Sequence, residues 1–316
     1  MTGGAGFIGS HLVDALSARG HEVLALDDLS TGHEENLEAA RAGTVILEIG
    51  DITDASFLGR AVGAFEPEIV FHLAAQADVR RAVADPGFDA LVNVVGTANV
   101  LEAARVAGCR SCVLVSTGGV MYGEGEGRSL PFVESDPAVP HTPYGTSKLG
   151  AEGYIGLYRR LHGMSGLSLR FGNVYGPRQD PHGEAGVVAI FCGRLLDGQP
   201  ATVFGDGMQT RDYVYVSDAV AALLSAADVL ATDPEAGPGP LNVGTGRETS
   251  VLDLLDRLSA IAGVSADPEL APARAGEVQR VSLDPAAAEA LMGWTARVDL
   301  DEGLRTTFDD LRSRRD

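Results

Sequence analysis

The hydrophobic pattern alternates between two kinds of segment in the first 173 residues. Short apolar runs, typical of strands buried on both faces, lie at 22–26, 44–49, 68–74, 112–116 and 167–171. Segments with the 3.6-residue period of amphipathic helices lie between or after them, at 9–19, 54–64, 90–107 and 144–162. Strands that alternate with helices build a parallel sheet with helices on both faces. The pattern therefore predicts an α/β fold with a Rossmann-type, doubly wound parallel sheet.

The alternation ends after Asn173, where loops rich in Gly, Pro and Asp replace it. A late amphipathic helix is expected at 252–263. We predict a cofactor-binding Rossmann domain over 1–173, with return segments near 213–244. A smaller, mixed α/β substrate-binding lobe is expected to consist mainly of 174–316.

The chain opens on a glycine-rich turn, GGAGFIG, that leads into the first helical segment. Gly3, Gly6 and Gly9 stand where such a turn needs positive φ, close approach to a pyrophosphate, or tight packing of helix on strand. The helix from about Phe7 offers free N–H groups and the positive end of its dipole. Asp27 ends the next apolar run, where a carboxylate binds an adenosine ribose and disfavours a 2′-phosphate. The motif predicts NAD rather than NADP.

A Rossmann sheet needs a strand that leads into the glycine turn, and only Met1 and Thr2 precede it in this sequence. We expect residues ahead of Met1 to complete that strand. A stunted central strand, which would deprive two neighbours of hydrogen bonds, is the alternative.

Two loops follow the ends of later strands, where open parallel sheets bind their ligands. Asp51 is placed to reach adenine, although a plain helix N-cap is an equally good interpretation of this residue. The segment 73–75 (Leu73, Ala74 and Ala75) would line the path of the ribose and the nicotinamide. His72 is more often a core histidine than a ligand, and it is left unassigned.

Net charge and cysteine content limit the classes of partner and the cellular location that we expect. The 316 residues carry a formal net charge of −20, which argues against nucleic acid because phosphate backbones are bound by surplus Lys and Arg. No apolar run reaches the roughly 18 residues of a membrane span, and the N-terminus shows no export signal. Cys109 and Cys112 form a lone C-x-x-C without a second half-site, so we expect structural thiols and no metal. The sparse cysteines suit a reducing cytoplasm, which is the predicted location.

The chain has 24 basic residues, of which only Lys148 is a lysine. Tyr144 precedes it by four positions, so both side chains project from one face of a helix. A tyrosine with an ordinary pKa of about 10 is a poor base near neutral pH, and a nearby cation stabilises its phenolate. Lysine also holds ribose hydroxyls in a geometry that the planar arginine fork does not reproduce. The pair predicts an acid/base centre beside the dinucleotide.

Several longer motifs accompany this pair: TGGAGFIGSHL, LDDLSTG, HLAAQADV, NVVGTANVLEAA, VSTGGVMYGE, PYGTSK, LRFGNVYGPRQ, RDYVYVSD and LNVGTG. Over nearly its whole length the chain resembles the extended short-chain dehydrogenase/reductases of the NAD-dependent epimerase/dehydratase family. Among these it is most similar to bacterial UDP-glucose 4-epimerases. The resemblance implies an isomerase that interconverts UDP-glucose and UDP-galactose, or their N-acetyl forms, through a transient 4-keto sugar. It also implies tightly bound NAD and a homodimer formed through the helices near 90–107 and 144–162.

The resemblance assigns roles to individual positions. Tyr144 becomes the acid/base, supported by Lys148, with Thr117 as the hydroxyl that bridges Tyr144 and the sugar. The implied cofactor contacts are Gly3, Gly6, Phe7, Ile8, Gly9, Asp27, Asp51, Ile52, Leu73, Ala74, Ala75, Asn93, Ser116, Tyr144, Lys148 and Phe171. The implied substrate contacts are Thr117, Asn173, Val187, Phe204, Arg211 and Arg274, of which the two arginines would clamp a diphosphate in paired hydrogen bonds.

Two positions depart from the family pattern. Gly118 stands where a small hydroxyl residue is usual, and Thr117 beside it or an ordered water could serve instead. Val281 stands where some relatives have a bulky tyrosine next to the sugar. We expect this smaller side chain to leave room for an N-acetyl group.

Three other functions compete with the epimerase. A nucleotide-sugar 4,6-dehydratase needs an extra acid and base, but Gly119 and Val120 occupy their positions. A UDP-glucuronate 4-epimerase differs only in contacts around C6 of the sugar and stays open. A non-catalytic NAD-binding protein would have a damaged tyrosine–lysine pair, whereas here the pair is intact.

Overall fold

The computed structural model describes residues 1–40, 43–125, 127–181, 186–236, 239–265, 267–274 and 277–315. The main sheet consists of β1 (Val23–Asp27), β2 (Val45–Ile49), β3 (Ile69–His72), β4 (Ser111–Thr117), β5 (Ser165–Phe171) and β10 (Leu241–Val243). The helices around it are α1 (Phe7–Ala18), α2 (Ala55–Phe65), α3 (Val79–Ala84), α4 (Pro86–Ala90), α5 (Gly96–Val106), α6 (Pro143–His162) and α8 (Val216–Thr232). A 3-10 turn, η1 (Glu34–Leu37), follows β1, and a π-helical turn, η3 (Leu91–Val95), joins α4 to α5.

The sheet is parallel throughout. β1 pairs with β2, and a second set of four strands runs in the order β10-β5-β4-β3. Thr2 joins the two sets, because it bridges Leu26 of β1 and His72 of β3. Hydrogen bonds from Thr2 N to Phe71 O (3.0 Å) and from Gly3 N to Leu26 O (2.8 Å) hold this point on both sides. A single bridging residue therefore stands at the central position of the sheet.

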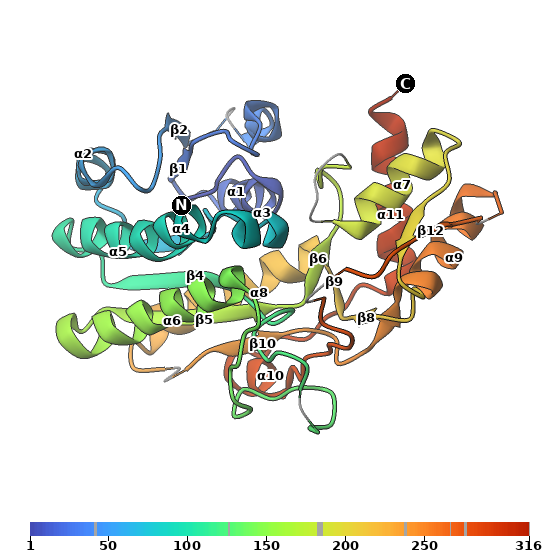
Figure 1. Cartoon of the computed structure of the whole chain (residues 1–316). Coiled ribbons are helices and arrows are strands. Elements are labelled where there is room, and N and C mark those ends of the chain that lie inside the picture. Colours follow the sequence, from blue (N-terminus) through green and yellow to red (C-terminus); the bar gives the residue numbers. More distant parts are fainter. Residues whose placement is uncertain are drawn as a thin grey trace.

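Helices cover both faces of the sheet, as the doubly wound prediction requires (Figure 1). Successive residues of β4 show the two faces, since side chains alternate along a strand. Cys112 and Leu114 pack in a cluster with α2, α5 and α6, whereas Val113 packs in a second cluster with α1 and α8. The predicted α/β class is confirmed, and the thiol of Cys112 lies in this core.

The remaining chain builds short strand pairs and a separate apolar cluster. Its strands are β6 (Asn173–Tyr175), β7 (Thr202–Phe204), β8 (Thr210–Arg211), β9 (Tyr213–Tyr215), β11 (Thr249–Ser250) and β12 (Glu269–Ala271). β6 pairs with β9 and β7 with β12 in parallel, while β8 and β11 are antiparallel. Its helices are α7 (Val187–Leu196), α9 (Val251–Ala262), α10 (Ala286–Met292) and α11 (Leu300–Ser313). Side chains of α7, α9 and α11 form their own cluster, far from α2 and α5 in Figure 1. The late helix expected at 252–263 is confirmed as α9.

Candidate active site

The glycine turn lies where the sheet, α1 and the loop after β3 meet. Gly3 has a φ of 68°, and a β-carbon there would lie 2.6 Å from the backbone nitrogen of Ala74. A β-carbon on Gly9 would collide with the carbonyl oxygen of Gly3. Gly6 is different, because a β-carbon would meet only the Gly3 carbonyl oxygen, at 3.4 Å. Gly3 and Gly9 thus close the turn on itself, while Gly6 leaves an open side on which a phosphate could approach.

The first turn of α1 can receive that phosphate. Gly6 caps the helix without a side-chain hydrogen bond, and Phe7 and Ile8, both half-buried, open its first turn. The initial N–H groups of a helix have no intrahelical acceptor, and they attract anions together with the helix dipole. The turn therefore fits the pyrophosphate of a dinucleotide.

Asp27 ends β1 beside this turn, as predicted. Its Oδ2 accepts from the Ala5 N–H (2.9 Å) and its Oδ1 from the Leu29 N–H (2.9 Å). The side chain is buried, and this burial raises its pKa. Asp27 thus holds the glycine turn to the end of β1, and each carboxylate oxygen keeps a second lone pair for a ribose hydroxyl.

The two loops after the neighbouring strands differ in what their side chains do. Asp51 is exposed and accepts from the Thr53 N–H at 2.7 Å, whereas Asp54 caps α2. The N-cap interpretation of Asp51 is therefore wrong, and its carboxylate faces solvent where adenine was expected. Ile52 is buried and packs on Gly96 of α5. Leu73, Ala74 and Ala75 are half-buried, and the backbone of Leu73 and Ala74 runs past Gly3 of the glycine turn. The path predicted along them for the ribose and the nicotinamide stays a prediction.

Tyr144 and Lys148 lie in the first turns of α6. Thr142 caps this helix by accepting from the Gly145 N–H at 3.1 Å, and Pro143 begins it. Lys148 is 3% exposed and its Nζ donates to the carbonyl oxygen of Val115 in β4 at 2.8 Å. Burial lowers the pKa of Lys148 to about 8, against the opposing charges of Glu152 and Asp89. Burial raises the pKa of Tyr144 above its ordinary value, and the charge of Asp89 adds to the rise.

A buried network behind this pair was missed by the sequence analysis. Asp89 of α4 is fully buried and accepts hydrogen bonds from Gln76, Asn93 and Ser147. Asn93 is 2% exposed, and its amide also exchanges hydrogen bonds with the backbone of Gln76. In the structure Asn93 braces the loop after β3, and its contact with the cofactor stays a prediction. The four-residue spacing of Asp89 and Asn93 on one helix was the available signal.

A second buried network surrounds Glu152, one helical turn after Lys148 on α6. Arg170 of β5 forms an ion pair with Glu152 of α6 (2.7 Å) and donates to the Tyr122 hydroxyl (2.9 Å). Ser116 donates to Glu152 at 2.6 Å. The hydroxyl hydrogen of Ser116 is thus directed to Glu152, so in this arrangement its oxygen can take part in the predicted cofactor contact only as an acceptor. Glu152 follows Lys148 by four residues, a spacing that the sequence analysis did not use.

Thr117 and Gly118 at the end of β4 face different surroundings. A β-carbon on Gly118 would overlap the end of the Leu283 side chain, so this position faces an apolar cluster and a side chain there would require Leu283 to shift. A β-carbon on Gly119 would lie 3.8 Å from the Thr117 hydroxyl and 3.5 Å from Asn173 Oδ1. Thr117 and Asn173 therefore face the same space, which favours Thr117 as the hydroxyl of the site.

Residues predicted to bind the nucleotide come together from three short segments. The Arg274 guanidinium lies over the ring of Phe204, with its carbon 3.7 Å from the ring centroid. Arg211 of β8 pairs with Glu277 at 3.2 Å, and the Glu277 N–H reaches the Arg274 carbonyl at 3.4 Å. These residues form one cationic and aromatic surface, in which Glu277 is a member that the sequence analysis missed. Its position three residues after Arg274 was the available signal.

Three other residues named in the sequence analysis lie in apolar or half-buried surroundings. Val187 is the half-buried first residue of α7. Phe171 ends β5, is 4% exposed and belongs to the cluster on the α8 side of the sheet. Val281 is 1% exposed, within a cluster that includes Tyr122 and Phe132. The room expected around Val281 is thus bordered by packed apolar side chains.

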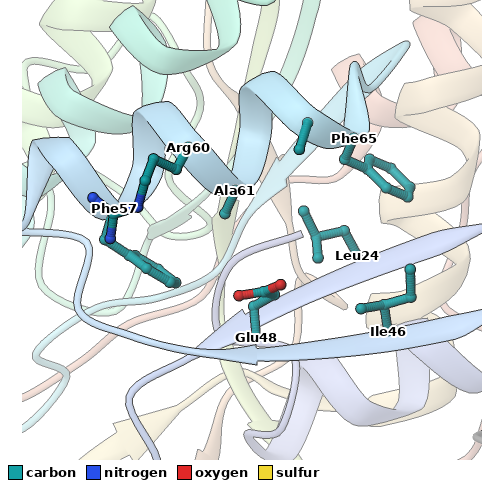
Figure 2. A pocket seen from close by; sticks show the side chains of 8 residues that line it. Leu24, Ile46, Glu48, Phe57, Arg60, Ala61 and Phe65 are labelled. Atoms are coloured by element: carbon teal, nitrogen blue, oxygen red, sulfur yellow. The ribbon is translucent and has the colours of Figure 1, made fainter.

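A groove of about 370 Å³ lies outside this arrangement, between α2 and the first two strands (Figure 2). Phe57 and Phe65 of α2 line it opposite Leu24 and Ile46. Leu24 and Ile46 are each the second residue of a strand, so the groove lies near the strand starts. Ligands of such sheets bind beyond the opposite ends. The groove therefore belongs to a different edge of the molecule.

Two features are absent from the residues that the structure describes. Among those residues, no group of three or more His, Cys, Asp or Glu side chains could hold a metal ion. No helix in the same ranges combines the length and apolar character needed to cross a bilayer. Cys109, Cys112 and Cys192 are buried free thiols.

Comparisons with known proteins agree with this geometry. Residues 1–244 match the NAD dependent epimerase/dehydratase family. The chain is 47% identical, over 89% of its length and 87% of the relative's, to a UDP-glucose 4-epimerase of Mycolicibacterium smegmatis. It is similar to the crystal structure of a Thermotoga maritima UDP-glucose 4-epimerase with UDP-glucose, with a TM-score of 0.94, 41% identity and coverage of 100% and 98% of the two chains. A Thermus thermophilus UDP-glucose 4-epimerase in complex with NAD has a TM-score of 0.88 and 43% identity, over 98% and 97% of the two chains.

Proposed function

The chain belongs to the NAD-dependent epimerase/dehydratase family, and from this premise we propose that it is a UDP-sugar 4-epimerase. It interconverts UDP-glucose and UDP-galactose, or their N-acetyl forms, through a transient 4-keto sugar. The observation that carries the proposal is the Tyr144–Lys148 pair on the first turns of α6, in which Lys148 donates to Val115 of β4, the strand that ends at Thr117. The M. smegmatis and T. maritima relatives carry the same activity in their names.

The family cofactor is NAD, which supplies an acceptor and donor for the hydride of the sugar C4. In our proposal Tyr144 accepts the proton of the 4-hydroxyl while C4 gives up its hydride. After the 4-keto sugar turns over, C4 would receive the hydride back on its other face, and Tyr144 returns the proton to the oxygen at C4. Lys148 stays cationic beside the phenol and lowers the cost of the phenolate. Thr117 orients the sugar hydroxyl toward Tyr144.

The nucleotide part of the substrate would lie on the surface formed by Phe204, Arg211 and Arg274. Arginine forks meet phosphate oxygens in pairs, and an aromatic ring stacks on a base. Asn173 would hold the diphosphate end of the sugar. Gly119 and Val120 provide no acid or base for elimination of water, which disfavours the dehydratase.

The test is turnover of defined sugar nucleotides by the purified protein. UDP-galactose is expected to be converted until it reaches equilibrium with UDP-glucose, as measured by chromatography. The absorbance of NADH is expected not to increase. UDP-N-acetylglucosamine, UDP-glucuronate and dTDP-glucose, each assayed separately, discriminate the N-acetyl, uronate and dehydratase activities. Failure to epimerise any UDP-hexose would reject the proposal, and steady release of NADH would indicate a dehydrogenase.

Three coarser expectations accompany this function. We propose a division into the Rossmann domain over 1–173 with return segments near 213–244, and the substrate lobe over 174–316. The separate cluster of α7, α9 and α11 supports it.

We propose a homodimer through α5 and α6, since Leu91 just before α5 and Leu161 on α6 are exposed by 45% and 65%. The buried free thiols support a reducing cytoplasm as the location.

A further inference from the structure

One fully buried carboxylate beside the site has no role in the chemistry above. Asp89 is 0% exposed. Its Oδ1 accepts from Gln76 Nε2 (3.1 Å) and Asn93 Nδ2 (3.0 Å), and its Oδ2 accepts from the Ser147 hydroxyl (2.6 Å). Burial of a carboxylate is costly unless hydrogen bonds or opposite charges compensate it. All three of these donors are neutral groups, so they do not cancel its charge.

The orientation of both amides identifies Asp89 as the acceptor. The Asn93 Oδ1 atom accepts from the Gln76 N–H at 3.0 Å, and the Gln76 Oε1 atom accepts from the Asp78 N–H at 2.7 Å. Each amide oxygen is thus engaged elsewhere, and the nitrogen ends turn to Asp89.

The network ties two other segments to the catalytic helix. Ser147 lies between Tyr144 and Lys148 on α6, Asp89 lies on α4, and Gln76 lies in the loop after β3. A shift of α6 along its axis would therefore break the Ser147 contact with Asp89. The same carboxylate interacts electrostatically with both Tyr144 and Lys148.

Resting on the proposed function, we propose that Asp89 is a positioning residue that fixes the register of α6 and sets the charge balance of the Tyr144–Lys148 pair. Its negative charge favours the cationic form of Lys148. The same charge disfavours the Tyr144 phenolate until the cofactor and substrate are bound. Premature ionisation of the phenol is thereby held back.

Other charged or titratable groups face the pair from the elements packed on α6. Glu152 lies on α6 itself and pairs with Arg170 of β5. His72 of β3 is buried between the hydroxyls of Thr2 and Thr97, and burial lowers its pKa to about 3, so it stays neutral. Arg81 of α3 is exposed and lies over the Phe88 ring. Of these, Glu152 acts with Asp89 to favour the cationic form of Lys148. The charge of Lys148 in turn helps to lower the pKa of His72.

The test compares Asp89→Asn with the wild-type holoenzyme over a range of pH. The amide oxygen can keep both N–H donors and its nitrogen can donate to Ser147, so the geometry is retained while the charge is lost. Because the charge of Asp89 raises the pKa of both Tyr144 and Lys148, its loss lowers both values. Both limbs of the kcat profile are expected to move to lower pH by about half a unit or more.

Two variants separate charge from position. Asp89→Glu keeps the charge but displaces it, so kcat is expected to fall while both limbs stay near their wild-type pH. Ser147→Ala removes one hydrogen bond and leaves the charge. Its kcat is expected to fall less than that of Asp89→Glu, and both limbs are again expected to stay near their wild-type pH. Melting temperature and bound NAD content establish that each variant is folded and loaded. Asp89→Glu also serves if Asp89→Asn does not fold, because wild-type kcat in this variant would overturn the positioning role.

A readout independent of turnover keeps this proposal separate from the proposed function. The near-ultraviolet absorbance of the Tyr144 phenolate is isolated by subtraction of the Tyr144→Phe spectrum at each pH. Asp89→Asn is expected to ionise this phenol at lower pH than the wild type. Identical titrations would overturn the electrostatic role of Asp89, even in a protein whose substrate is not a UDP-hexose.

Discussion

The two sides of the candidate site are built in different ways. On the chemistry side, Tyr144 and Lys148 lie on one helix, and buried networks around Asp89 and Glu152 fix the side chains behind them. On the nucleotide side, Phe204, Arg211 and Arg274 come from short strands and a loop, and Arg274 is exposed. Proton transfer tolerates little displacement, because efficiency depends on hydrogen-bond reach. A large, charged nucleotide can be held by several adaptable contacts, each of modest weight.

A single substitution on the chemistry side should therefore nearly abolish turnover, whereas a single substitution on the nucleotide side should reduce it only modestly. Tyr144→Phe keeps the ring and removes the group that exchanges the proton. Turnover of UDP-galactose is expected to fall by about 10²–10⁴-fold, the range for loss of a general acid/base. Chromatography of the sugar nucleotides measures the rate, and unchanged NAD content serves as the control. A Tyr144→Phe variant with wild-type turnover would remove the distinction between the two sides.

The two buried networks behind the Tyr144–Lys148 pair are expected to stabilise the fold as well as to position the pair. Arg170 and Glu152 have side chains that are 5% and 7% exposed. Glu152→Gln leaves the Arg170 charge buried without its partner, and removal of one member of such a pair costs about 3–5 kcal/mol of unfolding free energy. Asp89→Asn, which leaves no cation unpaired among its donors, is expected to cost about 1 kcal/mol. Denaturant unfolding of both variants measures this, and equal costs would show that the two networks are equivalent.

Substitution of Lys148 should raise the free energy of unfolding instead of lowering it, because burial of its charge opposes folding. Its pKa falls from 10.5 to about 8 in the folded chain, which corresponds to about 3 kcal/mol. The folded state then binds fewer protons than the unfolded state between these values, so stability rises with pH across this window. Lys148→Met is expected to gain up to about 3 kcal/mol below pH 8, with a gain that shrinks toward pH 10.5.

Unfolding of the Lys148→Met variant and the wild type at several pH values checks this sign. Bound NAD should first be removed from both proteins, since ligands stabilise the folded state by mass action. A loss of stability in Lys148→Met at neutral pH would mean that the Val115 hydrogen bond outweighs the cost of burial.

The same contrast explains which features the sequence revealed. The parallel sheet, the glycine turn and the Tyr144–Lys148 pair follow from local periodicity and spacing, which a single sequence displays directly. Asp89 and Glu152 lie in helical segments, where an acidic residue is ordinarily solvated. Their burial depends on Ser147 and Arg170, which come from other elements. Partners distant in sequence leave little local trace.

Steric limits were equally invisible before the fold was known. Gly118 could be recognised as a departure from the family pattern, but only the fold shows that a side chain there would overlap Leu283. The stacking of Arg274 on Phe204 joins residues seventy positions apart, on segments too short for a strong periodic signal. The nucleotide side was therefore assigned by resemblance, and the chemistry side largely by its own residues.

The smallest expected effect lies on the nucleotide side and tests its gradual character. Arg274→Ala removes a guanidinium that lies over Phe204 and that would also meet a diphosphate. One charge-assisted contact at an exposed site is worth about 1–2 kcal/mol, so KM for UDP-galactose is expected to rise about tenfold with kcat nearly unchanged. Arg247→Ala is the matched control, because its exposed arginine lies outside the predicted contacts and KM should not move. A fall in kcat as large as that of Tyr144→Phe would mean that Arg274 acts on the sugar ring itself, and the two sides would then be one.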